Sequence, residues 1–160
     1  MRLEKYKESD KQLYTQLVFN EKIMQMNYGR TFTPEEANML FQWIVRQNVS
    51  ELPFGTYKVF VGEEEEEYIG MGAILWNEED SVAEIEYMLL PKYWNQGYGT
   101  ALVGKLLKML KNGEQVNAIT DPANIGSQRI LQKHGFTLVK EDCNTEGAPV
   151  LLFQKIYENR

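Results

Sequence analysis

The sequence predicts a mixed α/β fold (α+β mixed sheet), in which helices flank one sheet. Apolar residues recur at helical spacing in two segments before residue 50, and at every second position over much of 54–90. An amphipathic helix begins directly after a glycine turn at 97–99. Along the chain the expected elements run β-α-α-β-β-β-α-β-α-β-β, an order typical of a sheet covered by helices.

The first fifty residues are expected to form one strand and two helices. Residues 2–6 read as the strand, and the polar pair 9–10 offers an N-cap for the first helix. The second helix has stronger signals, because Thr33 is a favoured cap and Pro34 stands at the first helical position. The segment 26–32 is expected to be a loop between the helices.

An antiparallel series of three strands follows. Residues 57–61 and 68–76 alternate in polarity around the glutamate run 63–67, a pattern typical of a hairpin with a solvated tip. Residues 82–90 form the third strand of this series.

The remainder alternates between helices and strands. The helix after the glycine turn is expected to run about four turns and to end at 112–113, with an apolar stripe of Leu102, Val103, Leu106, Leu107 and Leu110. A buried strand (116–120), a short helix (124–134) and two last strands (136–139 and 150–157) complete the chain. We expect residues 1–160 to form a single domain, because this length closes one sizeable core.

Composition excludes several classes of protein. No apolar run approaches the ~18 residues of a membrane span, and the first ten residues lack the apolar region of a signal peptide, so a cytoplasmic protein is expected. With one cysteine, Cys143, and one histidine, neither an internal disulfide nor a Cys/His zinc site can form, and no metal is expected. The net charge of −6 argues against nucleic acid and favours cationic small molecules or basic peptide ends.

The turn at 95–100 carries the first chemical signal. It leads from a strand into a helix, where unpaired N–H groups and the helix dipole favour a phosphate group. Gly97 and Gly99 would let a pyrophosphate approach the backbone, and Thr100 adds a hydroxyl. By itself this pattern equally suits a plain strand-to-helix turn.

Two spaced motifs make the chain resemble the GNAT superfamily of N-acetyltransferases. Trp94-Asn95-Gln96-Gly97-Tyr98-Gly99 is similar to the family's Arg/Gln-x-x-Gly-x-Gly/Ala turn, with Trp at the first position. Downstream, 124–136 is similar to the Asn-x-x-Ser helix and Lys-x-Gly-Phe ending of the branch that acetylates ribosomal-protein N-termini, on Asn124, Ser127, Lys133, Gly135 and Phe136. The resemblance covers nearly the whole chain.

The resemblance implies acetyl-CoA as co-substrate and a mostly antiparallel sheet with a splayed parallel pair. It implies that the strand 82–90 carries a bulge, that Met88 and Leu90 bind the pantetheine arm through their backbone, and that the Met88 N–H polarises the thioester carbonyl. Asn95, Gln96, Gly97, Tyr98, Gly99 and Thr100 would bind the pyrophosphate. Asn124 would hold the pantetheine unless it only caps its helix, and Lys133 would reach the phosphates unless it is simply exposed.

A general base is needed because an amine attacks only when neutral, and amine pKa values are ~8 or above. Glu84 and Glu86 lie two apart, hence on one face of a regular strand, just before the expected thioester site. Glu84 also resembles the base of histone-type GNAT enzymes and ranks first, Glu86 second. Solvent exposure of both remains the alternative.

The departing thiolate needs a proton donor. The tyrosine that many GNAT enzymes use falls at Leu131 here, so the resemblance points to Ser127, unless that serine only bonds its own helix. Tyr28, Phe32 and Tyr87 are candidates for the acceptor pocket, although core packing explains them equally well. His134 and Cys143 have plainer explanations, as a residue at a helix C-terminus and a simple thiol.

The expected function is therefore transfer of an acetyl group from acetyl-CoA to a primary amine, on a peptide N-terminus or a small molecule. The alternatives are a non-catalytic acyl-CoA-binding or sensor domain of the same fold, and acylation of a hydroxyl or transfer of a longer acyl chain. The protein would act as a monomer or homodimer.

Overall fold

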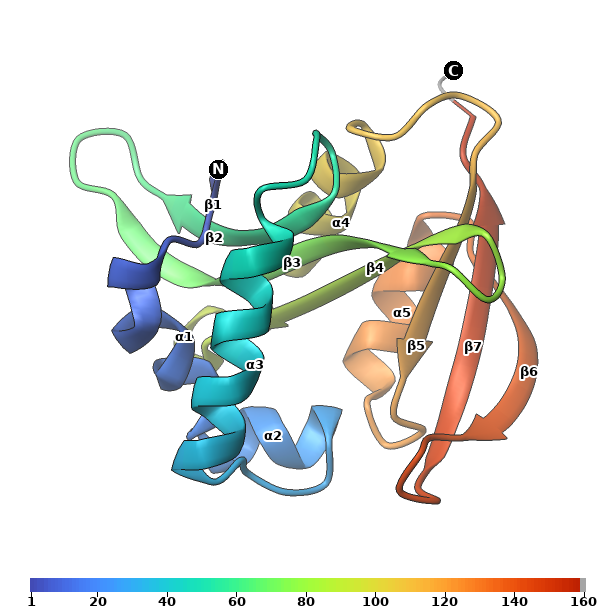
Figure 1. The fold of residues 1–160 in the computed structure, drawn as a ribbon. Helices are drawn as coiled ribbons and strands as arrows, with labels where there is room; N and C mark the ends of the chain where they lie inside the picture. Colours follow the sequence, from blue (N-terminus) through green and yellow to red (C-terminus); the bar gives the residue numbers. More distant parts are fainter. Residues whose placement is uncertain (159–160) are drawn as a thin grey trace.

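The computed structural model describes residues 1–158, and these form a seven-stranded mixed sheet flanked by helices (Figure 1). The strands are β1 (Arg2–Lys5), β2 (Gly55–Val61), β3 (Glu67–Asn77), β4 (Val82–Leu89), β5 (Gln115–Thr120), β6 (Thr137–Cys143) and β7 (Pro149–Ile156). The helices are α1 (Lys11–Val18), α2 (Glu21–Asn27), α3 (Pro34–Gln47), α4 (Tyr98–Leu107) and α5 (Ile125–Lys133), with 3-10 turns at Glu8–Asp10 and Pro91–Tyr93. The sheet order β1-β2-β3-β4-β5-β7-β6 confirms the predicted fold class.

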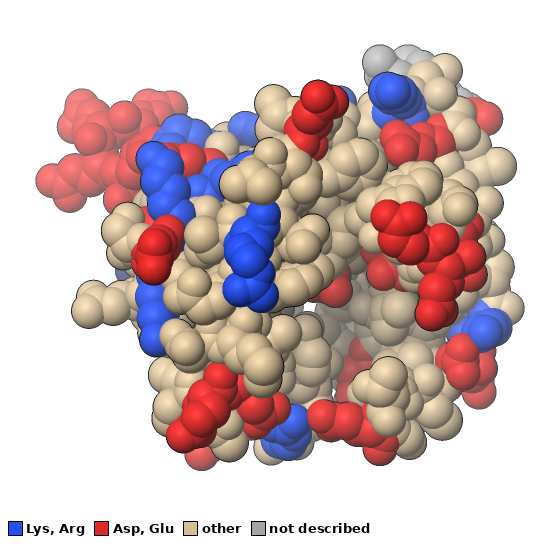
Figure 2. All heavy atoms as spheres, viewed as in Figure 1, with Lys and Arg blue, Asp and Glu red and all other residues tan. Residues whose placement is uncertain are grey.

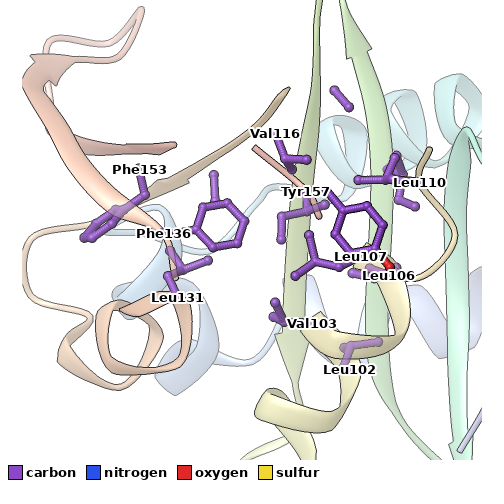
Figure 3. Close-up of a cluster of buried hydrophobic side chains, with 14 of the residues drawn as sticks. Leu102, Val103, Leu106, Leu107, Leu110, Val116, Leu131, Phe136, Phe153 and Tyr157 are labelled. Atoms are coloured by element: carbon purple, nitrogen blue, oxygen red, sulfur yellow. The ribbon is translucent and has the colours of Figure 1, made fainter. Parts of the chain in front are cut away.

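The helices bury the two faces of the sheet in two apolar clusters. Helices α1, α2 and α3 cover one face, where Leu17, Ile23 and Phe41 are fully buried against β3 and β4. Helices α4 and α5 cover the other face, and the predicted stripe of α4 lies in that core with Phe136, Phe153 and Tyr157 (Figure 3). At ~25 cal/mol per Å² of apolar surface, this two-sided burial is the main stabilising contribution. None of the helices within residues 1–158 has the length and apolar character needed to cross a bilayer.

Local signals predicted most of the elements, but one helix was missed and some element ends differ. Thr33 caps α3 as expected, with its hydroxyl accepting the Glu36 N–H at 3.2 Å and Glu36 bonding back to the Thr33 N–H. Helix α2 was not predicted, although Asn20 caps it by accepting the Ile23 N–H. Helix α4 ends at Leu107 rather than near residue 112, and β6 reaches Cys143.

The parallel pair β4–β5 separates part way along, as the resemblance implies. The two strands pair only at Ala83–Ile85 with Val116–Ala118, although β4 continues to Leu89 and β5 to Thr120. The implied bulge in β4 is not found in its pairing with β3, which keeps continuous register. The separation from β5 is therefore what leaves one edge of β4 without a strand partner.

Candidate active site

Two adjoining cavities lie where β4 and β5 separate. The large cavity, of about 500 Å³, extends between β4, the start of α4 and α5. The small cavity, of about 290 Å³, lies between β4, β5 and the end of α2. Residues common to both are Asn27, Tyr87, Met88, Asn124 and Ser127. A molecule in one cavity would therefore meet a molecule in the other beside Tyr87 and Met88.

The large cavity is built to accept an anionic group. Hydrogen bonding in α4 starts with the Ala101 N–H to the Gly97 carbonyl, so the three preceding N–H groups have no partner within the helix. Gly97 has φ 84°, a left-handed conformation that favours glycine. Arg129 and Lys133 of α5 also line this cavity. Cationic side chains and a helix N-terminus at one end suit a pyrophosphate.

Gly99 lies against α5. A Cβ at this position would lie 2.6 Å from Ile130 Cδ1, so a larger residue would require the end of the Ile130 side chain to move.

The backbone of β4 corrects one expectation. The Leu90 N–H donates to the Ile69 carbonyl at 2.8 Å, so it is not available to a ligand, and Leu90 lines neither cavity. Antiparallel ladders alternate, so Met88 also directs its N–H toward β3, opposite Met71, which contradicts the role expected for that N–H. The same alternation turns the N–H groups of Tyr87 and Leu89 toward the gap beside β5.

Trp94 is positioned at the mouth of this gap. Its indole N–H donates to the Leu89 carbonyl at 2.8 Å, and its ring lines the large cavity. Trp94 stands where the family motif has Arg or Gln. It still makes a polar contact, because its indole N–H bonds Leu89, the last residue of β4.

Glu86 lines the small cavity, where its side chain is exposed to solvent but is partly desolvated by the protein around the cavity. This desolvation, with a smaller contribution from the nearby Glu84 charge, raises the pKa of Glu86 from 4.5 to about 7. The Glu86 charge in turn is the largest cause that raises the pKa of Tyr28, and it contributes to raising the pKa of the buried Tyr14. A carboxylate with a pKa near neutrality can accept a proton and release it again.

Glu84 lines the same cavity with a different set of contacts. Its Oε1 accepts a hydrogen bond from Asn77 Nδ2 at 2.9 Å, which ties the carboxylate to the end of β3. It stands opposite Asn117, before the strands separate, whereas Glu86 stands beyond that point. Of the two glutamates, Glu86 is closer along β4 to the junction of the cavities.

Tyr87 and Ser127 form a hydrogen-bonded pair at that junction. Their hydroxyl oxygens lie 2.6 Å apart, and the Tyr87 hydroxyl also donates to the Ser127 carbonyl at 3.3 Å. Burial raises the pKa of Tyr87 to about 12, although the bond from Ser127 works in the opposite direction. The Tyr87 phenol therefore keeps its proton at neutral pH. Asn124 supports Ser127 by accepting its N–H at 3.1 Å, so Asn124 is an N-cap that also lines both cavities.

The structure brings most of the predicted residues to the cavities and leaves four outside. Tyr28, Glu84 and Glu86 line the small one, and Asn95, Gly97, Gly99, Thr100 and Lys133 the large one. Leu90, Gln96, Tyr98 and Phe32 line neither; Gln96 bonds the Lys92 carbonyl, Tyr98 packs on Tyr93, and Phe32 packs on Tyr28. Among lining residues not predicted are Arg129, Thr120 and Asp121. They lie in a helix, at the end of a strand and in the loop after it, respectively, and these positions carried no motif signal.

Comparison with known sequences gives one family. A sequence model of the acetyltransferase (GNAT) domain matches residues 1–137. A search of curated proteins gave no match.

Solved structures share the fold at low identity. The chain is similar to a domain from Methanocaldococcus jannaschii, with 18% identity, a TM-score of 0.77 and 97% of each chain covered. It is similar to the aminoglycoside acetyltransferase AAC(6')-Ib in complex with coenzyme A, with 19% identity, a TM-score of 0.75, and 96% of this chain and 93% of that one covered. It is also similar to a phosphinothricin acetyltransferase from Sinorhizobium meliloti in complex with acetyl-CoA, with 18% identity, a TM-score of 0.72, and 98% and 88% covered.

Proposed function

Because the chain belongs to the GNAT acetyltransferase domain family, we propose that it transfers the acetyl group of acetyl-CoA to a primary amine by direct attack. The observation that carries this proposal is the junction of two cavities beside the separated strands. One cavity has helix N–H groups and cations, and the other holds a carboxylate whose pKa lies near neutrality. We further propose that residues 1–160 act as a single acetyltransferase domain.

The large cavity would hold acetyl-CoA. Its pyrophosphate would take the N–H groups at the start of α4, between Gly97 and Thr100, with Arg129 and Lys133 near its phosphates. The N–H groups of Tyr87 and Leu89 face the gap, which suits the pantetheine arm and the thioester carbonyl. When bound, acetyl-CoA supplies the thioester whose carbonyl carbon the amine attacks, so that a C–N bond forms, the C–S bond breaks and the thiolate departs.

Glu86 would be the general base. It would take the proton that the attacking nitrogen loses, directly or through one water molecule. The pKa of about 7 leaves a large fraction of Glu86 ionised at neutral pH, while its basicity exceeds that of an ordinary carboxylate. The sequence ranked Glu84 first, but the Asn77 contact and the position of Glu84 before the separation of the strands favour Glu86.

Tyr87 and Ser127 would return a proton to the departing thiolate. Their hydroxyls are bonded to each other and line both cavities, so a proton given up by one can be replaced through the other. Ser127 thereby keeps the role of proton donor that the resemblance suggested. Tyr87 on β4 would supply a phenol in place of the tyrosine that many GNAT enzymes have at the position of Leu131.

The acceptor would be an amine on a peptide N-terminus or on a small molecule. The resemblance to the branch that acetylates ribosomal-protein N-termini supports the first, and the modest size of the small cavity supports the second. The test is release of CoA thiol over matched amine and hydroxyl acceptors, with kcat/KM for each. Amines should be preferred. Preference for a hydroxyl would overturn the N-acetyl assignment, and tight CoA binding without thiol release for any acceptor would select the non-catalytic alternative.

A further inference from the structure

Two segments far apart in the chain contribute walls to the small cavity. One is the loop after α2, where Tyr28 lines the cavity, and the other is the turn between β6 and β7, where Asn144 lines it. Figure 1 places this loop and this turn at the same end of the molecule. Figure 2 shows acidic and basic side chains together at the lower margin of the hollow between the N-terminal helices and the C-terminal strands. A contact between the two segments therefore bears on the width of the cavity.

An ion pair joins these two segments. Arg30, in the loop after α2, places its Nη2 3.0 Å from Glu146 Oε1 in the turn between β6 and β7. Neither residue lines the cavity, but each lies two positions along the chain from a residue that does, Tyr28 or Asn144. The ion pair thus connects the two walls from outside the lining.

Arg30 is held in position by the start of α3. Its Nη1 and Nη2 donate to Glu36 Oε1 at 3.0 Å and to Glu36 Oε2 at 2.8 Å, a bidentate arrangement. Glu36 is itself fixed, because its Oε1 also accepts the Thr33 N–H in the capping box of α3. Isolated exposed ion pairs contribute little, but bidentate geometry and a network of several charges are the conditions under which they matter. Arg30, Glu36 and Glu146 meet both conditions.

Glu146 is held by the turn in which it lies. The Oδ1 of Asn144 accepts the Glu146 N–H at 3.0 Å and the Ala148 N–H at 2.9 Å. The Gly147 N–H donates to the Asn144 carbonyl at 3.0 Å, and Gly147 has φ 81°, a left-handed conformation that favours glycine. Both partners of the ion pair are therefore presented by backbone that local hydrogen bonds already order, so the contact costs little further conformational entropy.

Resting on the proposed function, we propose that Arg30 and Glu146 form a latch that determines the size of the acceptor. The latch holds the loop after α2 against the turn between β6 and β7 and keeps the acceptor cavity compact, at about 290 Å³. It favours a small amine over a bulky one. Arg30 and Glu146 are positioning residues, because they act through the walls of the cavity, so their loss should change KM more than kcat.

The first test measures acceptor size. It compares kcat/KM for butylamine and 4-phenylbutylamine, which share the reacting end and differ in bulk, and the wild type should prefer butylamine. Glu146→Ala and Arg30→Gln should each reduce this preference about two- to fivefold, the effect of one exposed ion pair, through KM and not kcat. The control Glu141→Ala removes an equal charge from an exposed residue of β6 and should keep the preference. An unchanged preference in both latch variants would overturn the proposal.

The second test needs no catalysis. Desolvation is the largest cause that raises the pKa of Glu86 to about 7, so a cavity that opens to water should lower this pKa. The other titratable groups around Glu86 stay in place in both variants; they are Glu84 on β4, Tyr14 on α1, Tyr28 after α2 and Asp121 after β5. The pKa of Glu86 can be measured by NMR of its carboxyl carbon in protein without acceptor.

The two latch variants separate hydration from charge. Arg30→Gln removes a cation, which by itself would raise the pKa of Glu86, whereas Glu146→Ala removes an anion, which by itself would lower it. Opening of the cavity lowers the pKa in both variants. We expect a fall in both, and any other combination would overturn the latch. A fall in both variants, together with no release of CoA thiol for any amine, would leave the latch in place and refute the proposed acetyl transfer.

Discussion

Replacing Glu86 by glutamine should make the protein more stable and less active. In the folded protein the pKa of Glu86 is about 7, because the cavity desolvates the carboxylate and Glu84 repels it. Its ordinary value is 4.5. Glutamine has nearly the same shape but no charge, so it removes the cost of ionising a group in this position.

The sign of the stability change depends on pH. Below about pH 4.5 the Glu86 carboxyl is protonated in both the folded and the unfolded state, so it does not lower the free energy of unfolding. Between 4.5 and 7 the folded protein binds more protons than the unfolded chain, so the free energy of unfolding falls as pH rises. Above about pH 7 Glu86 is ionised in both states, and the full loss in the free energy of unfolding is present.

The size of this cost follows from the pKa difference. At ~1.36 kcal/mol per pKa unit the difference corresponds to about 3.4 kcal/mol. Because Glu86 meets solvent through the cavity opening, screening reduces this to on the order of 1–2 kcal/mol. Glu86→Gln should therefore raise the free energy of unfolding by that amount at pH 8, roughly 2–8 °C in Tm, and leave it nearly unchanged at pH 4.

The rate should change in the opposite direction. Loss of a general base costs ~10²–10⁴-fold, and the wild-type inflection of kcat/KM near pH 7 should disappear. Activity should recover at high pH, where the amine loses its proton unaided. Urea unfolding at pH 4 and pH 8 and a pH series of CoA release measure the two effects on the same variant.

Glu84→Gln is the matched control. It removes the charge that helps raise the pKa of Glu86, so the inflection should move to lower pH but remain. The reasoning is refuted if Glu86→Gln is no more stable at pH 8 than the wild type, or if the inflection is lost in Glu84→Gln and kept in Glu86→Gln.

Three further predictions concern the cofactor cavity, the core and the hydrogen bonds of Asn48. Lys133→Gln and Arg129→Gln should each weaken CoA binding about 2- to 5-fold, less at high salt, and unchanged calorimetric affinity would remove that residue from the site. Leu106→Ala should cost about 2–5 kcal/mol in urea unfolding, since Leu106 is fully buried; a loss below ~1 kcal/mol would contradict its place in the core. Asn48→Ala should cost about 2–4 kcal/mol, because its side chain bonds the Tyr6 carbonyl and both backbone groups of Thr56, and normal stability would show these bonds to be dispensable.

The order of elements and the fold class were readable from the sequence, because helix and strand periods, caps and glycine turns are local signals. Thr33 and Pro34 predicted the start of α3, and the turn at 97–99 predicted the start of α4. The end of α4 was misread, since Leu110 is buried in the core although the helix already ends at Leu107. A buried apolar residue continues the stripe whether or not its backbone is helical.

The sequence alone determined that two glutamates share one face of β4 and that a glycine turn begins a helix. It ranked Glu84 ahead of Glu86 on resemblance alone, because the pKa of Glu86 depends on how much protein surrounds it and on the charge of Glu84, which only the folded arrangement decides. Nor could it show that Leu90 is bonded to Ile69, or that Asp121 lines the same cavity as the two glutamates. Those contacts join segments far apart in the chain or depend on the register of strand pairing. Local sequence patterns specify neither of these.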